Sequence, residues 1–339
     1  MQSLIYTGPR QLEWQERPDL SLSGSQEAIV RPIASTTCDL DRRIIAGNTP
    51  FPGPFALGHE AVGEVLEIGD HVRLVKPGDL VVIPWHISCG TCPQCRRGLP
   101  AHCEAHTGFN GYGVPIAGDW GGLFSEQVRV PYADAMLHVL PAGVDPIAAA
   151  SAGDNLTDSY IGVSNGLTKH PGAPVLVMNG IDSLGLLATE HALALGARQV
   201  DFVDTRDERL DAAKRMGARP HRTVPDEFIG QYPVVIGATR DQADLRKAAL
   251  CLAPGGHLSN VSIFMEDVKI PYWEMYLSGV SISFGLANVG PQIPSVLKLA
   301  ACGHIHPERL ATVYDAKDAT EALLSDDIKP VIVRPRLLG

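Results

Sequence analysis

The sequence predicts an α/β protein in which a mainly β region is followed by a doubly wound parallel sheet. Short apolar runs separated by glycine and proline occupy roughly the first 130 residues, a pattern typical of strands joined by turns. Later, the apolar run Val175–Asn179 lies between Pro174 and Gly180, as expected of a parallel strand buried on both faces. Strands and helices then alternate, which favours a parallel sheet covered by helices.

The first region contains strands, one short helix and several loops. Ser3–Tyr6 and Ala28–Arg31 are apolar strands, and Cys38 begins a short helix. The turn Val75–Asp79 separates two further apolar strands, and the chain returns to strand over residues 121–131. Many strands and few helices indicate a small barrel.

A glycine-containing turn after the buried strand predicts a nucleotide site. The turn Gly180–Gly185 opens a helix that runs to about Leu195, and a second strand, Val200–Val203, ends at Asp204. Glycine permits a tight turn, the helix N-terminus attracts a pyrophosphate, and the later carboxylate accepts hydrogen bonds from ribose hydroxyls. This β-α-β unit therefore predicts a Rossmann domain that binds a dinucleotide. The predicted contacts are Gly180, Ile181, Ser183, Leu184, Gly185, Asp204, Arg209 and Val261.

The residues after the second strand bear on which dinucleotide binds. Asp204 favours NAD, because a carboxylate repels the 2′-phosphate of NADP. Arg206 and Arg209 argue in the opposite direction, although both are also ordinary at the solvated start of a helix. We therefore expect NAD.

Four of the seven cysteines form a compact metal-binding pattern. Cys89, Cys92, Cys95 and Cys103 have the spacing C-x2-C-x2-C-x7-C. Four thiolates close a tetrahedron around zinc and leave no open position, which predicts a structural site. An iron–sulfur cluster is the alternative, but the bacterial ferredoxin run has a shorter last gap followed by proline, and here Glu104 follows. Disulfides are disfavoured because closely spaced cysteines bridge poorly.

His59 and Glu60 form a second candidate metal site between Gly58 and an apolar stretch. Neutral imidazole is the commonest protein ligand for zinc, and an adjacent carboxylate can bind the ion or support its ligands. Cys38 and Asp154 are further candidate ligands that only the fold could bring to His59. The alternative is a core histidine beside a surface glutamate.

Length and charge exclude several classes of function. The 339 residues, 45% hydrophobic and 19% charged, are enough for two domains with cores. A net charge of -10 without a basic cluster argues against nucleic-acid binding. No charged-then-apolar leader opens the sequence, and no apolar run approaches the roughly 18 residues that span a membrane. We expect a cytoplasmic protein that binds neither nucleic acid nor membrane.

The order of these motifs resembles the zinc-containing medium-chain dehydrogenase/reductase family, the alcohol dehydrogenase superfamily. In that family a Gly-His-Glu follows a Cys-x-x-Asp by about twenty residues and precedes a four-cysteine lobe and a dinucleotide-binding domain, as here. The resemblance covers the chain from end to end. Within the family it points toward the formaldehyde dehydrogenase branch, through Val130–Ala135 and an aspartate at the third ligand position.

The resemblance implies a domain organisation. Residues 1–150 would form a GroES-like catalytic barrel with a structural-zinc lobe at residues 86–106. Residues 151–286 would form the NAD-binding Rossmann domain, and residues 287–339 would return to the catalytic domain. Relatives commonly pair through the sheet edge near residues 280–285, which implies a homodimer or homotetramer.

The resemblance also implies a catalytic zinc in addition to the structural one. Cys38, His59 and Asp154 would hold it, with Glu60 as a neighbouring support or transient ligand, and the fourth position would take the substrate oxygen. Zinc would lower the pKa of the alcohol, and the resulting alkoxide would give hydride to nicotinamide. The implied substrate is a small-molecule alcohol or carbonyl compound.

Four positions depart from the family pattern. Leu40 and Arg43 stand where relatives carry a hydroxyl residue and often a histidine that relay the alcohol proton to water. Asp158 replaces a threonine that contacts nicotinamide, so we expect it beside the cofactor. Asp182 replaces the middle glycine of the phosphate turn. Its carboxylate either repels the pyrophosphate or points outward as an ordinary turn residue.

The leading hypothesis is an NAD-dependent zinc alcohol dehydrogenase. The alternative is a zinc-stabilised family member with impaired cofactor binding that works as a binding or regulatory protein. A quinone or enoyl reductase is disfavoured, because those relatives lack the zinc expected at Cys38, His59 and Asp154.

Overall fold

The computed structural model describes residues 1–106, 108–116 and 118–338, which form two compact units. The first unit comprises Met1–Thr157 and Ala287–Gly339, and the second comprises Asp158–Leu286. The expected boundary after residue 150 differs from this division. The reason is helix α5 (Asn155–Lys169), whose first residues belong to the first unit and whose remainder belongs to the second.

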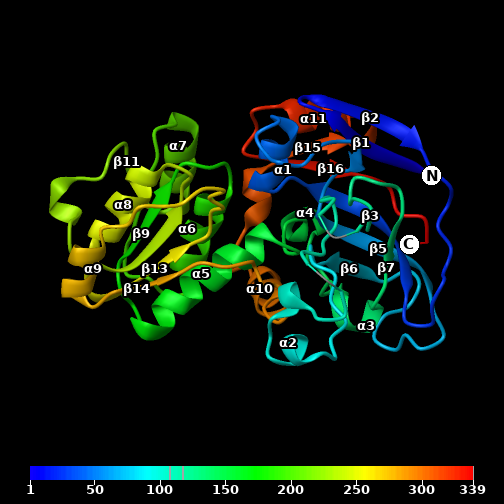
Figure 1. Cartoon of the computed structure of the whole chain (residues 1–339), viewed down its shortest axis with the longest axis horizontal. Coiled ribbons are helices and arrows are strands. Elements are labelled where there is room, and N and C mark those ends of the chain that lie inside the picture. The colour runs from blue at the N-terminus through cyan, green and yellow to red at the C-terminus, as the bar shows by residue number, and fades with distance from the viewer. Residues whose placement is uncertain (107, 117, 339) are drawn as a thin grey trace. The chain divides into compact units, whose positions relative to one another are not determined.

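The first unit is mainly β, with two sheets. A three-stranded antiparallel sheet has the order β2-β1-β4, and a larger sheet has the order β15-β16-β3-β5-β6-β8, with β7 paired to β3 (Figure 1). The strands are β1 (Gln2–Gly8), β2 (Gln11–Glu16), β3 (Ala28–Thr36), β4 (Phe55–Ala56), β5 (Glu60–Ile68), β6 (Leu80–Ile83), β7 (Val128–Val130), β8 (His138–Val139), β15 (Ala311–Asp315) and β16 (Lys329–Val333).

Short helices and turns connect these strands. They are α1 (Asp39–Ile45), α2 (Pro93–Arg96), α3 (Ala133–Met136), α4 (Pro146–Ala149), α10 (Ile293–Ala301) and α11 (Ala319–Leu324), with the 3₁₀ turns η1 (Pro100–His102), η3 (Pro307–Leu310) and η4 (Ala316–Asp318). No helix in the described part of the chain is long and apolar enough to cross a membrane.

The C-terminal segment completes the larger sheet. Strand β16 pairs antiparallel with β3, Val331 opposite Thr36, and parallel with β15. Beyond it, the buried Glu64 carboxylate accepts hydrogen bonds from Arg336 Nε at 3.0 Å and from Leu337 N at 2.6 Å. Residues about 270 positions apart in sequence therefore share one core.

Two local expectations were wrong. The pattern of residues 147–152 and 154–163 predicts a helix that continues past Gly153, but α4 ends at Ala149 and α5 begins at Asn155. Only Val128–Val130 is strand within residues 121–131. The preceding residues instead form a turn whose amides bind another loop: Leu123 N donates to Gly58 O at 2.8 Å.

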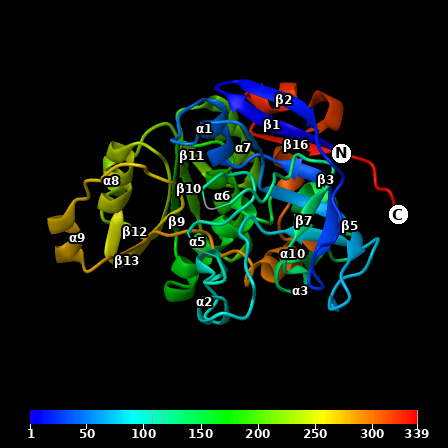
Figure 2. The same cartoon turned by 45° about the vertical axis from the view of Figure 1, so that its right-hand side comes forward.

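The second unit confirms the predicted Rossmann architecture. Its six parallel strands have the order β11-β10-β9-β12-β13-β14, the arrangement of the dinucleotide-binding fold. Figure 2 shows β9, β10 and β11 side by side. The strands are β9 (Val175–Asn179), β10 (Val200–Val203), β11 (Arg219–His221), β12 (Tyr232–Ala238), β13 (Leu252–Asn260) and β14 (Ser281–Ser283). The remaining helices are α6 (Leu184–Ala194), α7 (Asp207–Met216), α8 (Gln242–Leu250) and α9 (Tyr272–Ser278), with the 3₁₀ turn η2 (Asp226–Phe228).

Helices cover both faces of this sheet, which explains its continuous apolar strands. Successive residues of a strand point to opposite faces. Val234 packs against Gly166 of α5, whereas its neighbour Val235 belongs to a core cluster with Leu245 and Ala248 of α8. Both faces are therefore dry, and polar residues inside the strands need specific partners.

Asp201 in β10 is such a residue. Its fully buried carboxylate accepts from Arg219 Nε at 3.0 Å, His221 Nε2 at 2.8 Å and Tyr232 Oη at 2.9 Å. Arg219 and His221 come from β11, which pairs with β10, Tyr232 begins β12, and Gln199 donates as well. One carboxylate thereby satisfies polar groups of three elements.

We expect Asp201→Ala to destabilise the protein by about 3 kcal/mol, because it leaves buried donors such as Tyr232 Oη without an acceptor. Denaturant unfolding followed by circular dichroism measures the loss. Asp211→Ala, on the exposed side of α7, removes the same group and should change the free energy of unfolding by less than about 0.5 kcal/mol. Equal effects of the two substitutions would contradict a structural role for the Asp201 network.

Candidate functional site

Three side chains predicted to bind metal converge within the first unit. Cys38 is the N-cap of α1, His59 precedes β5, and Asp154 precedes α5. Their candidate ligand atoms all lie within 4.8 Å of one another, and His59 Nε2 is 3.3 Å from Asp154 Oδ2. A thiolate, an imidazole and a carboxylate in this arrangement can act as three of the four ligands of a catalytic zinc ion. The donor chemistry therefore fits the implied metal.

Backbone geometry aims His59 at the cluster. Gly58 has φ +95°, and a Cβ added there would lie 2.4 Å from Phe124, so only glycine fits. The other imidazole nitrogen, Nδ1, lies 3.3 Å from Asp41 Oδ1. A carboxylate at that nitrogen favours the tautomer that leaves Nε2 free to bind a metal.

The sequence analysis did not identify Asp41 as a site residue, although a signal was present. Asp41 stands three residues after Cys38, the spacing of a helix capping box. Its carboxylate accepts from Cys38 N at 2.9 Å, and Leu40 N donates to Cys38 Sγ at 3.4 Å. Asp41 thus positions two of the three candidate ligands, Cys38 through the backbone and His59 through the ring.

Glu60, predicted as a neighbouring support or transient ligand, is not part of this cluster. Both of its carboxylate oxygens have other partners: Oε2 accepts from Lys329 Nζ at 2.7 Å, and Oε1 accepts from Asn155 N at 2.7 Å. Lys329 also donates to Thr37 O at 2.6 Å. Glu60 is therefore a support behind the ligands in this structure, and Lys329 is a site residue that no local pattern indicated.

Burial and charge shift the protonation of the candidate ligands. Burial and the nearby Asp154 carboxylate raise the pKa of the Cys38 thiol well above its usual value. Burial would lower the pKa of His59, but Asp41, Cys38 and Asp154 reverse this and raise it. A divalent cation favours the opposite forms, a thiolate and a neutral imidazole. Metal binding at this cluster should therefore release protons.

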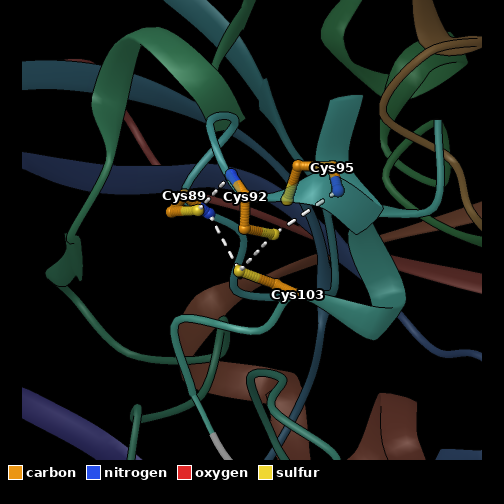
Figure 3. Close-up of side chains that lie close together, drawn as sticks. All are labelled: Cys89, Cys92, Cys95 and Cys103. Carbon is orange, nitrogen blue, oxygen red and sulfur yellow. Dashed lines mark hydrogen bonds between the residues drawn. The ribbon is translucent and has the colours of Figure 1, made fainter. Parts of the chain in front are cut away.

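The four-cysteine pattern forms the second candidate metal site. Figure 3 shows the side chains of Cys89, Cys92, Cys95 and Cys103 converging, and their sulfur atoms lie within 4.8 Å of one another. Cys92 Sγ and Cys103 Sγ are 3.9 Å apart. Zinc–sulfur bonds of about 2.3 Å in a tetrahedron require sulfur separations of about 3.8 Å. The geometry fits a closed tetrathiolate site.

Backbone amides favour the thiolate at Cys89 and Cys92, whereas burial raises the pKa of Cys95 and Cys103. Cys89 Sγ accepts from Cys92 N at 3.4 Å, and Cys92 Sγ accepts from Cys95 N at 3.5 Å and from Glu104 N at 3.3 Å. Although burial raises the pKa of Cys89, hydrogen bonds from Thr91 and Cys92 lower it to about 6. Donors arranged around sulfur favour the thiolate that binds metal.

The predicted nucleotide turn lies between β9 and α6. Gly185 packs so closely on Asn179 that a Cβ would lie 2.1 Å from Asn179 Oδ1. Asn179 Nδ2 donates to Ile181 O at 3.0 Å and to Asp204. Asn179, which the sequence analysis did not single out, thus joins the turn to the acidic residue after β10.

Asp204, Arg209 and Asp182 form one charged group. Arg209 Nη1 lies 3.4 Å from Asp204 Oδ2, and Arg209 Nη2 donates to Asp182 Oδ1 at 2.7 Å. Arg206 N donates to Asp204 Oδ1 at 2.8 Å. In the structure, Asp182 therefore has a cationic partner. The sequence suggested either that its carboxylate repels the pyrophosphate or that it points outward, and neither alternative included this ion pair.

Several other residues predicted to contact the cofactor lie at or beside the same turn. Val261 packs against a small core cluster that contains Ile181 and Leu184, and Ser183 is the N-cap of α6. Asp158 lies in the first turn of α5. Leu40, at the position of the usual relay hydroxyl, packs against an apolar core and offers no proton-transfer group.

Comparison with known proteins agrees with both units. The family described as "Alcohol dehydrogenase GroES-like domain" matches residues 24–142. A probable zinc-binding alcohol dehydrogenase of Mycobacterium tuberculosis is 29% identical over 92% of this chain and 81% of its own. A glutathione-independent formaldehyde dehydrogenase of Pseudomonas aeruginosa is 34% identical, over 63% of this chain and 56% of its own.

A solved structure extends the similarity over the full length. The alcohol dehydrogenase TADH from Thermus sp. ATN1 has a TM-score of 0.89 and 31% identity, and the match covers 98% of this chain and 99% of that one. The fold, the order of the motifs and this similarity lead to one conclusion. The chain belongs to the zinc-containing medium-chain alcohol dehydrogenase family.

Proposed function

We propose that the protein is a zinc-dependent alcohol dehydrogenase that interconverts an alcohol and an aldehyde or ketone by hydride transfer with NAD. The convergence of Cys38, His59 and Asp154 is the observation that carries this proposal. Three protein ligands leave a fourth position for the substrate oxygen, as in catalytic zinc sites. The tetrathiolate, in contrast, is closed and suits a structural ion.

The surrounding residues keep the catalytic cluster in place. Asp41 orients His59 and the Cys38 backbone, while the pair of Glu60 and Lys329 fills the space behind the ligands with balanced charge. When bound, zinc supplies Lewis acidity that lowers the pKa of the alcohol, and NAD accepts the hydride. The protein contributes position and charge.

The dinucleotide site supports NAD as the cofactor. Asp204 directly follows β10, and its buried carboxylate can accept from a ribose hydroxyl and would repel a 2′-phosphate. Its Oδ1 atom accepts a hydrogen bond from Arg206 N, and a carboxylate oxygen can accept a second one. One acceptor position can thus face the ribose.

The binding-protein alternative depended mainly on Asp182 repelling the pyrophosphate. Its pairing with Arg209 weakens that argument, because the carboxylate charge is compensated within 2.7 Å. A turnover assay with a panel of primary and secondary alcohols and NAD separates the two functions. Absence of turnover by a zinc-loaded protein, together with weak NADH binding, would favour the alternative.

We expect two zinc ions per chain by metal analysis of the purified protein. His59→Ala should reduce this to one, abolish turnover and leave the fold intact, because the tetrathiolate remains. Cys95→Ser should lower the melting temperature by several degrees, because an incomplete structural site leaves its loop without cross-links. Cys302→Ser, which removes an exposed thiol, is the matched control and should change neither property. One ion or none in the wild type, or equal unfolding in both site variants, would refute this division.

We expect kcat/KM to be at least tenfold higher with NAD than with NADP, because about 1.4 kcal/mol of repulsion at Asp204 suffices for that factor. Asp204→Ala should narrow the gap by lowering the value for NAD and raising that for NADP. Asp211→Ala removes an exposed carboxylate of the following helix and should leave the ratio unchanged. A wild type that prefers NADP would show that Asp204 does not set the cofactor.

We further propose that the protein is a homodimer or homotetramer joined through the edge of the second unit. Strand β14 ends the parallel sheet and pairs with β13 alone among the described strands. Exposed apolar side chains gather in α9 and just after β14, and they include Trp273, Tyr276, Leu277 and Phe284. Large exposed apolar patches and open sheet edges both favour association.

Sedimentation equilibrium should therefore give a mass of two or four times 36.3 kDa at micromolar concentration. Phe284→Glu should shift the protein toward the monomer, because a charge at a buried interface must be desolvated. Leu74→Glu places the same charge at an exposed leucine of the first unit and should have no effect. A monomeric wild type would exclude this assembly.

A further inference from the structure

We propose that Asp182 is a cofactor-specificity residue that acts through Arg209. Asp182 and Asp204 together bind the guanidinium group of Arg209. That group is then not available to bind the 2′-phosphate of NADP. This inference rests on the proposed dinucleotide site and adds to it a residue in the phosphate turn that helps the enzyme to select NAD over NADP.

The geometry of Arg209 is the first support. Its side chain is only 6% exposed, and its two terminal nitrogens point to different carboxylates: Nη2 to Asp182 at 2.7 Å and Nη1 to Asp204 at 3.4 Å. The shorter contact is the one to Asp182. Asp182 thus supplies the better hydrogen bond, and it holds the guanidinium from the side of the turn.

The charge balance is the second support. Arg209 lies next to Asp204, where the adenosine ribose is recognised, and an arginine at this place is the usual means of accepting a 2′-phosphate. Guanidinium groups bind phosphates through paired hydrogen bonds, for which Nη2 would be needed. With both carboxylates present, the group of three carries one net negative charge, which repels the phosphate. Without Asp182 it would be neutral and Nη2 would be free.

The position of Asp182 in the turn allows two effects to be distinguished: repulsion of the pyrophosphate and control of Arg209. A carboxylate that repelled the pyrophosphate would weaken NAD and NADP binding equally, since both contain that group. A carboxylate that controls Arg209 acts only on the 2′ position. The ratio of the two affinities therefore separates the proposal from simple repulsion.

The experiment measures dissociation constants of NADH and NADPH by nicotinamide fluorescence for the zinc-loaded wild type and four variants. Asp182→Asn keeps the size of the side chain and removes its charge. We expect it to tighten NADPH about tenfold, the effect of one gained charge-assisted contact, and to change NADH by less than about twofold. The gain for NADPH should shrink at high salt.

A double-mutant cycle tests whether Asp182 acts through Arg209. In the background of Arg209→Gln, Asp182→Asn should no longer improve NADPH binding, whereas a general charge effect would persist. Asp207→Asn is the matched control: it removes one carboxylate charge from the first turn of α7, where Asp207 binds Arg222 and not Arg209. It should leave the ratio of affinities within about twofold of the wild type.

The outcomes separate three readings. A selective gain for NADPH that disappears without Arg209 supports the proposal. Equal tightening of both cofactors would overturn it in favour of pyrophosphate repulsion, and an unchanged ratio would overturn it as well. A wild type that binds neither cofactor would instead refute the dinucleotide site itself, and so the proposed function.

Discussion

The antiparallel pairing of β3 with β5 is the constraint on which the candidate metal cluster depends. Its register sets Thr36 opposite Glu60, at the end of one strand and the start of the other. Cys38 follows the first strand by two residues, and His59 precedes the second by one. A shift of this register by one residue would exchange the faces of β5 and move His59 away from Cys38. The register of this sheet therefore fixes where two of the three candidate ligands lie.

Buried ion pairs hold the segments that carry the two candidate sites. Glu60 and Lys329 join β5 to β16 behind the candidate zinc ligands, and Arg209 joins Asp182 to Asp204 beside the nucleotide turn. A buried ion pair adds little net stability compared with apolar packing, but loss of one partner leaves an uncompensated charge. Such pairs therefore specify positions more than they stabilise the fold.

Local patterns in the sequence were sufficient for the fold and for the four-cysteine candidate site. The predicted strands Val175–Asn179 and Val200–Val203 have the same bounds in the structure, because apolar runs between turn residues encode buried strands directly. The cysteine spacing encodes its site in the same way, since all four ligands lie within fifteen residues. The helix predicted across Gly153 was wrong because propensity does not record where a chain must turn.

The sequence by itself determined the two-part α/β architecture, the four-cysteine site and the chemistry of the candidate zinc ligands. Only the tertiary structure decided what the acidic residues near those sites do. Glu60 meets Lys329 across 269 residues, and Asp182 meets Arg209 across 27. Periodicity and spacing report how a segment folds, but the direction of a side chain and its charged partner depend on strand order and register. The role of a carboxylate that departs from its family motif can therefore be assigned only when its charged partner is known.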